Sequence, residues 1–411
     1  MIGNSDLASS AKLDKTLKTD VTMVIEMTQV MPDQKLGFLT GRGGRCGPNL
    51  AVLATALVCI GGQCAAQSGP FKNGAAVPET ETAEAVGVRN GSFIVAPIPF
   101  SSPSLGAGLA LGGAYLFRAD EGSNSSTVGF GAFKSDNDSE GYALGWDVNF
   151  GNGEWTTSFL LADANLNYDL YVAGFPIPVS QSLQGYTIGF ARSISEQVEI
   201  GIGIGYGESE VQLRGGGALP PILEAATQLK LARLTFDVER DFRDDNFYPT
   251  TGSLSTGSLI YGRAVDNGEL HYGKLVLTSN YYWPVTEKGV LAVRGSVCAS
   301  TDEAPFFDSC ALGGVDAFRG YVATEFIDNA LLSAQVEYRG RLTNRLGFVA
   351  FAGIGSVGED FGDALGNDLK VAVGIGARIR LSKTFPVDYA IDLSYNEAQE
   401  SILYVSVGQR F

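Results

Sequence analysis

The sequence is poor in the residues that enzymes and metal centres most often use. Its 411 residues include one histidine, His271, and only four methionines. No Gly-x-Ser-x-Gly segment marks the nucleophile of a hydrolase. A single histidine also leaves a metal site without its most common ligand. We therefore expect no enzymatic activity, no cofactor and no metal.

Long apolar runs and positive charge are scarce as well. No segment reaches the roughly 18 consecutive apolar residues of a membrane-spanning helix. The sequence has 29 basic and 45 acidic residues, and its net charge is −16. Because nucleic-acid binding needs a basic surface, we expect no nucleic-acid partner. The same charge disfavours an attachment to acidic lipid that rests mainly on electrostatics.

The five cysteines are unevenly placed along the chain. Cys46, Cys59 and Cys64 fall in the first 66 residues, which leaves Cys298 and Cys310 at a spacing of 12 positions. In an oxidising compartment this pair favours a disulfide that closes a loop. The alternative is a metal site, which would need further ligands nearby.

The beginning of the chain is typical of an exported protein. Residues 31–66 have the order of a secretory signal peptide: a basic start, an apolar stretch over residues 51–60 and small residues before position 67. The basic residues are Lys35, Arg42 and Arg45. Residues 1–30 show no such pattern, and we expect them to be a misannotated extension. Residues 67–100 are expected to be a short periplasmic lead.

Glycine is abundant, with 53 residues, and it alternates with apolar side chains. In residues 198–207 isoleucine and tyrosine share one face and glycine the other. In residues 371–381 valine, isoleucine and leucine alternate with glycine and arginine. This period of two indicates β-strands, and an apolar face backed by glycine or charge is what a membrane barrel requires. A soluble sandwich would show the same stripe, so the export signal and the chain end favour the barrel.

Counting the alternating segments predicts an all-β fold, a membrane-spanning antiparallel barrel of about sixteen strands over residues 101–411. The first strand is expected near residue 111 and the last near 406, with separate strands near 158 and 170. Short connections fall on one side of this barrel, the periplasmic side, at residues 195–197, 286–289 and 343–345. Long connections fall on the outer side, at residues 208–225, 300–329 and 358–368.

The last strand carries a candidate assembly signal. Phe411 ends the sequence, and the period of two places it on one face with Leu403, Val405 and Val407. A terminal aromatic residue on an alternating strand resembles the signal by which outer-membrane barrels are recognised for assembly. Gln409 departs from that pattern, and an ordinary edge strand that ends in phenylalanine is the alternative.

Three further segments carry a resemblance to a known family. They are DFRDDNFYPTTG at residues 241–252, LGGVDAFRGY at 312–321 and VGIGAR at 373–378. Together they resemble the assembly barrels of the BamA/TamA type, the bacterial surface antigen family, over about residues 95–411. The resemblance implies a location in the outer membrane of a Gram-negative-type bacterium. It also implies that the long sixth outer loop, which holds the second segment, folds inward into the barrel.

Within that loop the resemblance assigns a structural lock to Arg319, Gly320 and Tyr321. An unpaired arginine inside a barrel would cost several kcal/mol, so we expect an acidic partner, and Glu337 lies on an inward face of its strand. A solvated loop arginine is the alternative. The family also has an acidic residue in the thirteenth strand, where this sequence has Gly353, and this departure predicts a weaker lock.

The family resemblance implies a non-enzymatic role in outer-membrane protein assembly or translocation. A weak seam between the first and last strands would open for client strands. The expected partners are outer-membrane lipid, unfolded barrel clients or an unknown periplasmic subunit. About 35 residues separate position 66 from the expected barrel, too few for a domain, so we expect no periplasmic receptor domain. A passive pore or structural barrel that has lost client handling is the alternative function.

Overall fold

The computed structural model describes residues 87–217, 219, 227–246, 248–266, 269–314, 317–380 and 388–411. The expected extension, the signal peptide and positions 67–86 of the lead lie outside the described residues. Within those described ranges, none of the helices has the length and apolar character needed to cross a membrane.

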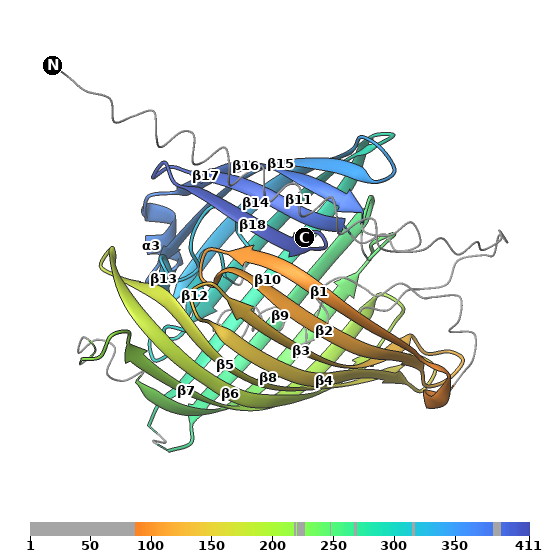
Figure 1. The fold of residues 1–411 in the computed structure, drawn as a ribbon, viewed down its shortest axis with the longest axis horizontal. Helices are drawn as coiled ribbons and strands as arrows, with labels where there is room; N and C mark the ends of the chain where they lie inside the picture. The colour runs from red at the N-terminus through yellow and green to blue at the C-terminus, as the bar shows by residue number, and fades with distance from the viewer. Residues whose placement is uncertain are drawn as a thin grey trace. The chain divides into compact units, whose positions relative to one another are not determined.

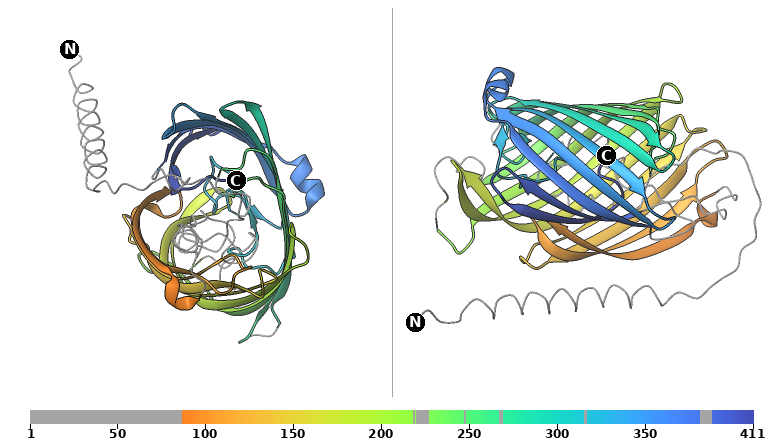
Figure 2. Two further views of the ribbon diagram at one scale, coloured as in Figure 1. Left: turned by 90° about the vertical axis from the view of Figure 1, so that its right-hand side faces the viewer. Right: turned by 90° about the horizontal axis from the view of Figure 1, so that it is seen from above.

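Sixteen antiparallel strands close into a barrel in which β18 lies beside β1 (Figures 1 and 2). The strands follow one another in chain order, except that β12 (Cys310–Ala311) and β13 (Ile327–Asp328) form a separate two-stranded sheet between β11 and β14. The barrel strands are β1 (Ser92–Ser102), β2 (Gly106–Arg118), β3 (Ser125–Ser135), β4 (Glu140–Phe150), β5 (Trp155–Val172), β6 (Phe175–Ser193), β7 (Val198–Leu213), β8 (Gln228–Asp241), β9 (Gly252–Ala264), β10 (His271–Thr286), β11 (Gly289–Ser300), β14 (Ala330–Arg341), β15 (Leu346–Gly358), β16 (Lys370–Arg380), β17 (Asp388–Asn396) and β18 (Ser401–Val407). The described residues also form two short helices, η3 (Val88–Asn90) and α3 (Phe361–Gly366).

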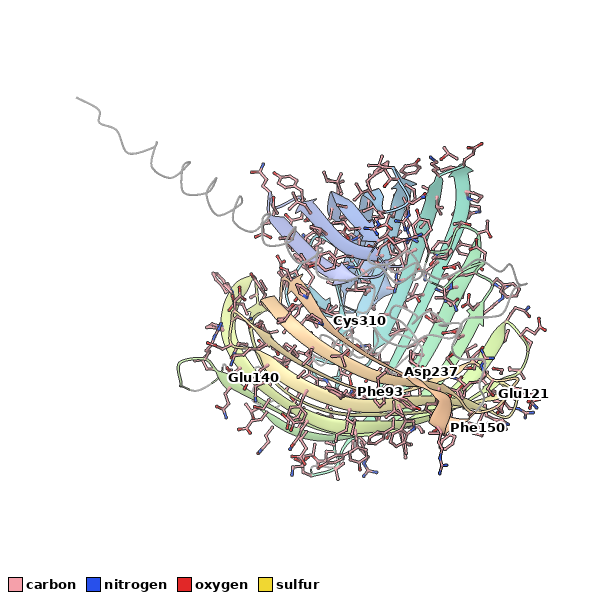
Figure 3. The ribbon with its side chains drawn as sticks, turned by 45° about the vertical axis from the view of Figure 1, so that its right-hand side comes forward. Phe93, Glu121, Glu140, Phe150, Asp237 and Cys310 are labelled. Atoms are coloured by element: carbon pink, nitrogen blue, oxygen red, sulfur yellow. A yellow bond between two sulfur atoms is a disulfide. The ribbon has the colours of Figure 1, made fainter. Side chains whose placement is uncertain are left out.

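The alternation in the sequence becomes the two faces of the barrel wall. Ile202 and Ile204 are 45% and 58% exposed, and Phe93, labelled in Figure 3, is 81% exposed. The side chain of Arg378 is buried. Successive side chains of a strand point to opposite faces, so apolar residues form the outer surface while charges and small residues face the interior. The predicted barrel of sixteen strands is confirmed.

Two strand assignments made from the sequence are wrong, and they compensate each other. Residues near 158 and 170 belong to one long strand, β5, which reaches its turn only at Ala173 and Gly174, both with positive φ. Conversely, β1 begins at residue 92, so the barrel starts earlier than the expected boundary at 101. Two prolines within β1 hide its strand character, because proline cannot donate a ladder hydrogen bond.

Because these two errors cancel, the later connections group at two opposite ends of the barrel as expected, and the membrane side of each end stays a prediction. The short connections at residues 195–197, 286–289 and 343–345 each lead from an even to an odd strand of the closed sheet, so they share one end. The long connections share the opposite end, which we call the outer end. The connection expected at 208–225 is shorter than predicted, because β7 continues to Leu213 and β8 begins at Gln228.

Candidate functional site: an arginine and carboxylate cluster inside the barrel

The segment between β11 and β14, residues 301–329, is attached to the inner face of the wall. Cys298 of β11 and Cys310 of β12 form a disulfide with their Cα atoms 5.7 Å apart. Both cysteines are fully buried. Leu312 and Phe318 are buried with them in one apolar cluster that includes Leu331 of β14. The disulfide therefore ties the beginning of this segment to a strand of the barrel.

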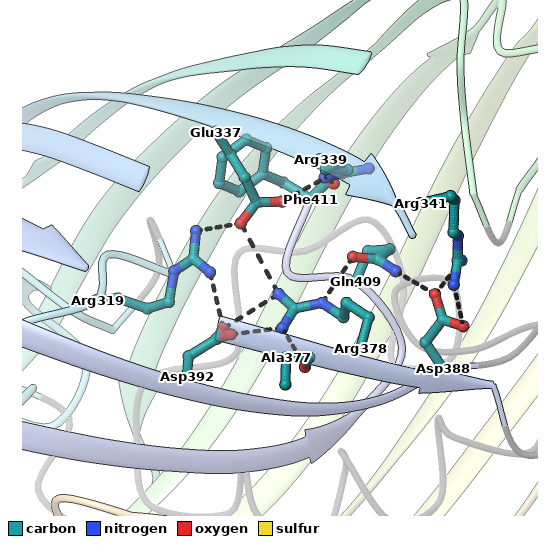
Figure 4. A network of polar contacts seen from close by, with 10 residues as sticks. All are labelled: Arg319, Glu337, Arg339, Arg341, Ala377, Arg378, Asp388, Asp392, Gln409 and Phe411. Carbon is teal, nitrogen blue, oxygen red and sulfur yellow. Dashed lines mark hydrogen bonds and ion pairs between the residues drawn. The ribbon is translucent and has the colours of Figure 1, made fainter. Parts of the chain in front are cut away.

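Arg319 is the centre of a buried ionic cluster (Figure 4). Its Nη2 lies 2.5 Å from Oε2 of Glu337, the partner expected from the sequence, and its Nη1 lies 2.7 Å from Oδ2 of Asp392. The guanidinium also lies over the ring of Phe351, 3.6 Å from its centroid. These three residues come from β14, β17 and β15, so one loop side chain contacts three strands. The carboxylates of Glu337 and Asp392 offset the large desolvation cost of burying the charged guanidinium of Arg319.

Gly320 and Tyr321 extend the contact to β16, β17 and β18. The Gly320 N–H donates to the hydroxyl of Tyr404 at 2.9 Å, and its carbonyl accepts from Nδ2 of Asn396 at 3.0 Å. Gly320 has φ +125°, and an added Cβ would lie 2.3 Å from the Cβ of Ala372. The hydroxyl of Tyr321 donates to the carbonyl of Val371 at 2.9 Å. Glycine is required at 320 both for its backbone conformation and for the close approach to β16.

Asp392 is the residue of this cluster that sequence reasoning missed. At position 353, where the family has an acidic residue, an added Cβ would lie 2.6 Å from the ring of Phe318, so an aromatic side chain takes that space. Asp392 supplies the second carboxylate from β17 instead, at 2.7 Å from Nη1 of Arg319, and a weaker lock stays a prediction. The polar residues at alternate positions 388, 392, 394 and 396 were the signal that could have found it.

The cluster continues from the loop to the last residues of the chain. Glu337 also accepts from Nε of Arg339 at 2.7 Å, and Arg378 bonds to Asp392. Arg378 in turn donates through Nε to Oε1 of Gln409 at 3.0 Å. Arg339 donates to the main-chain oxygen of Phe411. Charged hydrogen bonds therefore connect the loop, three strands and residues 409–411 in one network (Figure 4).

Phe411 does not share the outer face with Leu403, and that prediction is wrong. β18 ends at Val407, and Gly408 has φ +95°. Phe411 is only 7% exposed and packs with Tyr282, Val290 and Ala292 of β10 and β11, whereas Leu403 is 48% exposed. The left-handed turn at a glycine, which no alternation pattern encodes, carries the chain off the wall and inward. A role for Phe411 as an assembly signal remains a prediction.

A second buried charge holds the middle of the same loop. Asp308 lies 3.1 Å from Nη2 of Arg233 on β8 and accepts from the hydroxyl of Tyr272 on β10. Lys274, also on β10 and buried, donates through Nζ to the main-chain oxygen of Ser309 at 3.2 Å. The loop is thus held on the β8–β10 side as well as on the β14–β18 side. Sequence reasoning did not identify this anchor.

The DFRDDNFYPTTG segment forms the turn between β8 and β9. Oδ1 of Asp244 accepts from the N–H groups of Thr250 and Thr251 at 2.9 and 3.0 Å. At Gly252, with φ +95°, an added Cβ would lie 2.0 Å from the carbonyl oxygen of Phe242. Burial pushes the pKa of Asp244 up, but the hydrogen bonds from Thr250 and Thr251 outweigh burial and lower it. One carboxylate therefore organises the turn.

The seam between β1 and β18 is the weakest strand pairing of the closed sheet. In the part of the chain that the structure describes, these strands pair at one position, Ser101 with Val405. β17 and β18 pair at seven positions, and β1 and β2 at eleven. In the register of that single pair, Pro99 would face Val407. The part of β1 before Pro99 therefore extends past the point where Gly408 turns the chain inward.

His271, the one histidine, opens β10 and is exposed, with Nδ1 3.1 Å from the main-chain oxygen of Glu269. The described residues contain no group of three or more His, Cys, Asp or Glu side chains placed to hold a metal ion.

The closed barrel with an apolar outer face and a charged interior defines the class of outer-membrane β-barrel proteins of Gram-negative bacteria.

The comparisons with known proteins place the chain within that class. The Omp85 superfamily domain matches residues 108–411, and the chain belongs to the Omp85 superfamily. No curated protein matches the sequence.

Solved structures with the same barrel fold include a BamA barrel and two CdiB barrels. BamA from Haemophilus ducreyi lacking POTRA domains 1–3 matches with a TM-score of 0.56 and 14% identity, covering 78% of this chain and 70% of that one. CdiB from Acinetobacter baumannii matches at 0.52 and 12%, covering 89% and 72% of the two chains. CdiB from Escherichia coli matches at 0.52 and 13%, covering 84% and 67%. At these identities the likeness concerns the fold.

Proposed function

We propose that this barrel assists the insertion or translocation of unfolded β-strand chains at the outer membrane, and that it does so without enzymatic chemistry. The β1–β18 seam is the working site. The observation that carries the proposal is its single paired position, Ser101 with Val405, in a barrel whose other strand pairs are extensive. Membership of the Omp85 superfamily supports the same assignment.

The chemistry of the seam is strand pairing. A strand edge with open N–H and C=O groups is a template for another strand, and the addition of a strand to such an edge is a general mode of peptide recognition. Pro97 and Pro99 of β1 lack an N–H group, and proline within a sheet is typical of edge strands. A weakly closed β1 edge separates from β18 at a lower cost than any fully paired strand.

The ionic cluster gives the seam one fixed side. Arg319 contacts β14 and β17, and Gly320 donates to Tyr404 of β18. The loop therefore holds β18 to the neighbouring wall while β1 is joined to it by little more than one residue pair. We propose that Arg319, Gly320, Tyr321 and Glu337 act as a lock that keeps the β14–β18 wall rigid when β1 moves away. The partners in this proposal are outer-membrane lipid, unfolded barrel clients and a periplasmic subunit that delivers them.

A reversible tether across the seam tests the function. The variant Ser101→Cys/Val405→Cys joins the two strands under oxidation at their paired position. Ile391→Cys/Val405→Cys is the matched control, because it links the same residue of β18 to its other neighbour, β17. Both variants are reconstituted in liposomes and supplied with an unfolded porin.

We expect oxidation to stop porin insertion by the seam variant and reduction to restore it, while the control inserts porin in both states. If both oxidised variants insert porin equally well, the seam is not the working site. If the untethered protein conducts ions but never accelerates insertion, the passive pore is the function and client handling is ruled out.

A further inference from the structure

The short helix α3 lies on the outer surface of the barrel wall, at the outer end. Figure 2 shows it as a blue helix outside the ring of strands. The inner face of β15 is identified by Phe351, Gly353 and Gly355, which contact Arg319, Phe318 and Leu312 of the inner loop. The even-numbered residues of β15 therefore face outward, as the 46% exposure of Ile354 shows.

The outward face changes character under α3. Ser356 and Ala330, the β14 partner of Gly358, share the outward face but are only 2% and 3% exposed. Gly358 follows on the same face, and an added Cβ there would lie 2.4 Å from the main-chain nitrogen of Ala364. Ala364 is itself buried. Small residues on the outside of the wall thus form a seat on which the helix rests.

Local contacts hold the helix in that seat. Asp360 caps its first turn by accepting from the N–H of Asp363 at 2.9 Å. Beyond its last turn, Nδ2 of Asn367 donates to the carbonyl of Val357 at 3.0 Å. A six-residue helix is not stable alone, so the cap and the seat fix both its position and its orientation.

The helix leaves large apolar side chains uncovered. Phe361 and Leu365 are one turn apart, on one side of the helix, and are 40% and 74% exposed. Leu369, 53% exposed, follows the helix and continues the outward face of Val371 and Val373 on β16. These side chains extend the apolar outer face of the barrel beyond the strands, and exposed apolar surface of this kind marks an interaction site.

We propose that α3 is a membrane anchor that lies in the outer leaflet, with Phe361 and Leu365 inserted among the lipid chains. Its occupant is lipid because the exposed side chains are continuous with the apolar barrel surface that already faces lipid. The polar residues Asp360, Asp363 and Asp368 remain at the headgroup level, which is the division of an interfacial amphipathic helix. The anchor holds the outer end of β14–β16 at a set depth in the membrane.

Tryptophan quenching measures the depth of the helix. Leu365→Trp is compared with Asp363→Trp. Residues two positions apart in an α-helix lie about 200° apart around its axis, so the two side chains point in different directions. Both full-length variants keep the three native tryptophans, so the emission of the parent protein is subtracted. The proteins are reconstituted in vesicles of phosphatidylcholine with brominated acyl chains, and iodide is added as the aqueous quencher. A heat-dependent gel shift verifies that each variant is folded.

We expect the brominated lipid to remove most of the emission added by Leu365→Trp and iodide to remove little of it. Asp363→Trp should show the reverse. If iodide quenches Leu365→Trp and brominated lipid does not, α3 lies in water and the proposal fails. It also fails if neither quencher acts and the protein is a dimer in detergent that Leu365→Asp converts to a monomer, because a second copy is then the occupant. If Leu365→Trp does not fold, Phe361→Trp provides the same measurement.

Discussion

Arg319 and Asp392 lie 73 positions apart in the sequence, and inside the barrel their Nη1 and Oδ2 atoms are 2.7 Å apart. This contact, together with the one to Glu337, joins the loop between β11 and β14 to strands β17 and β14, which belong to the part of the wall that borders the seam at β18. The stability of the loop and the rigidity of the β14–β18 wall therefore depend on the same charges.

Arg319→Ala should destabilise the barrel and expose the loop to protease. Breaking a fully buried ion pair costs roughly 3–5 kcal/mol. The loss here should be smaller, because Arg339 and Arg378 still neutralise Glu337 and Asp392. The free energy of unfolding in urea measures the effect, and Arg345→Ala at an exposed turn position is the control. An Arg319→Ala protein with unchanged stability and loop protection would remove the proposed lock.

Gly320→Ala should lower the free energy of unfolding more than the addition of one methyl group suggests. The new Cβ meets Ala372, and the backbone has φ +125°. The double variant Gly320→Ala/Ala372→Gly should recover the part of the loss that comes from the steric overlap and leave the part that comes from the backbone. Unfolding free energies of the two single variants and the double variant form a cycle that separates these contributions. Additive effects would show that the two residues do not press on each other.

Phe411→Ala should lower the stability of the folded barrel by about 3 kcal/mol, the lower end of the cost of removing a buried phenylalanine side chain. Leu403→Ala on the lipid face is the control and should cost less, because its side chain remains exposed in the folded barrel. Unfolding in lipid vesicles measures both. If Phe411→Ala leaves the stability of the folded barrel intact and impairs only its assembly in cells, the residue acts as a targeting signal and not through its packing.

Asp244→Asn should weaken the turn between β8 and β9 in a pH-dependent way. Because the folded state lowers the pKa of Asp244 below its ordinary value of 3.8, the carboxylate stabilises the protein above about pH 4. That contribution is lost as pH falls through the lowered pKa. The difference in unfolding free energy between the parent and Asp244→Asn should therefore be constant from pH 7 to 5 and shrink below 4. A difference that stays the same down to pH 3 would exclude the charge as its cause.

The sequence by itself determined the class of the protein. A side-chain period of two is a local property of one strand. It showed which residues of segments such as 198–207 and 371–381 face outward without any knowledge of how the strands pair. The same alternation placed Glu337 inside the barrel. Because a buried arginine needs a carboxylate partner, Glu337 could be predicted as the partner of Arg319.

Only the tertiary structure decided what depends on the path of the chain through space. The alternation of side chains identifies Asp392 as inward-facing, but only the closure of the sheet brings it beside Arg319. The positive φ at Gly408 takes Phe411 away from the lipid face and into the cluster, and the small residues around Gly358 let α3 rest outside the wall. These features come from contacts between residues distant in sequence and from single glycine conformations, and the alternation of side chains carries information about neither.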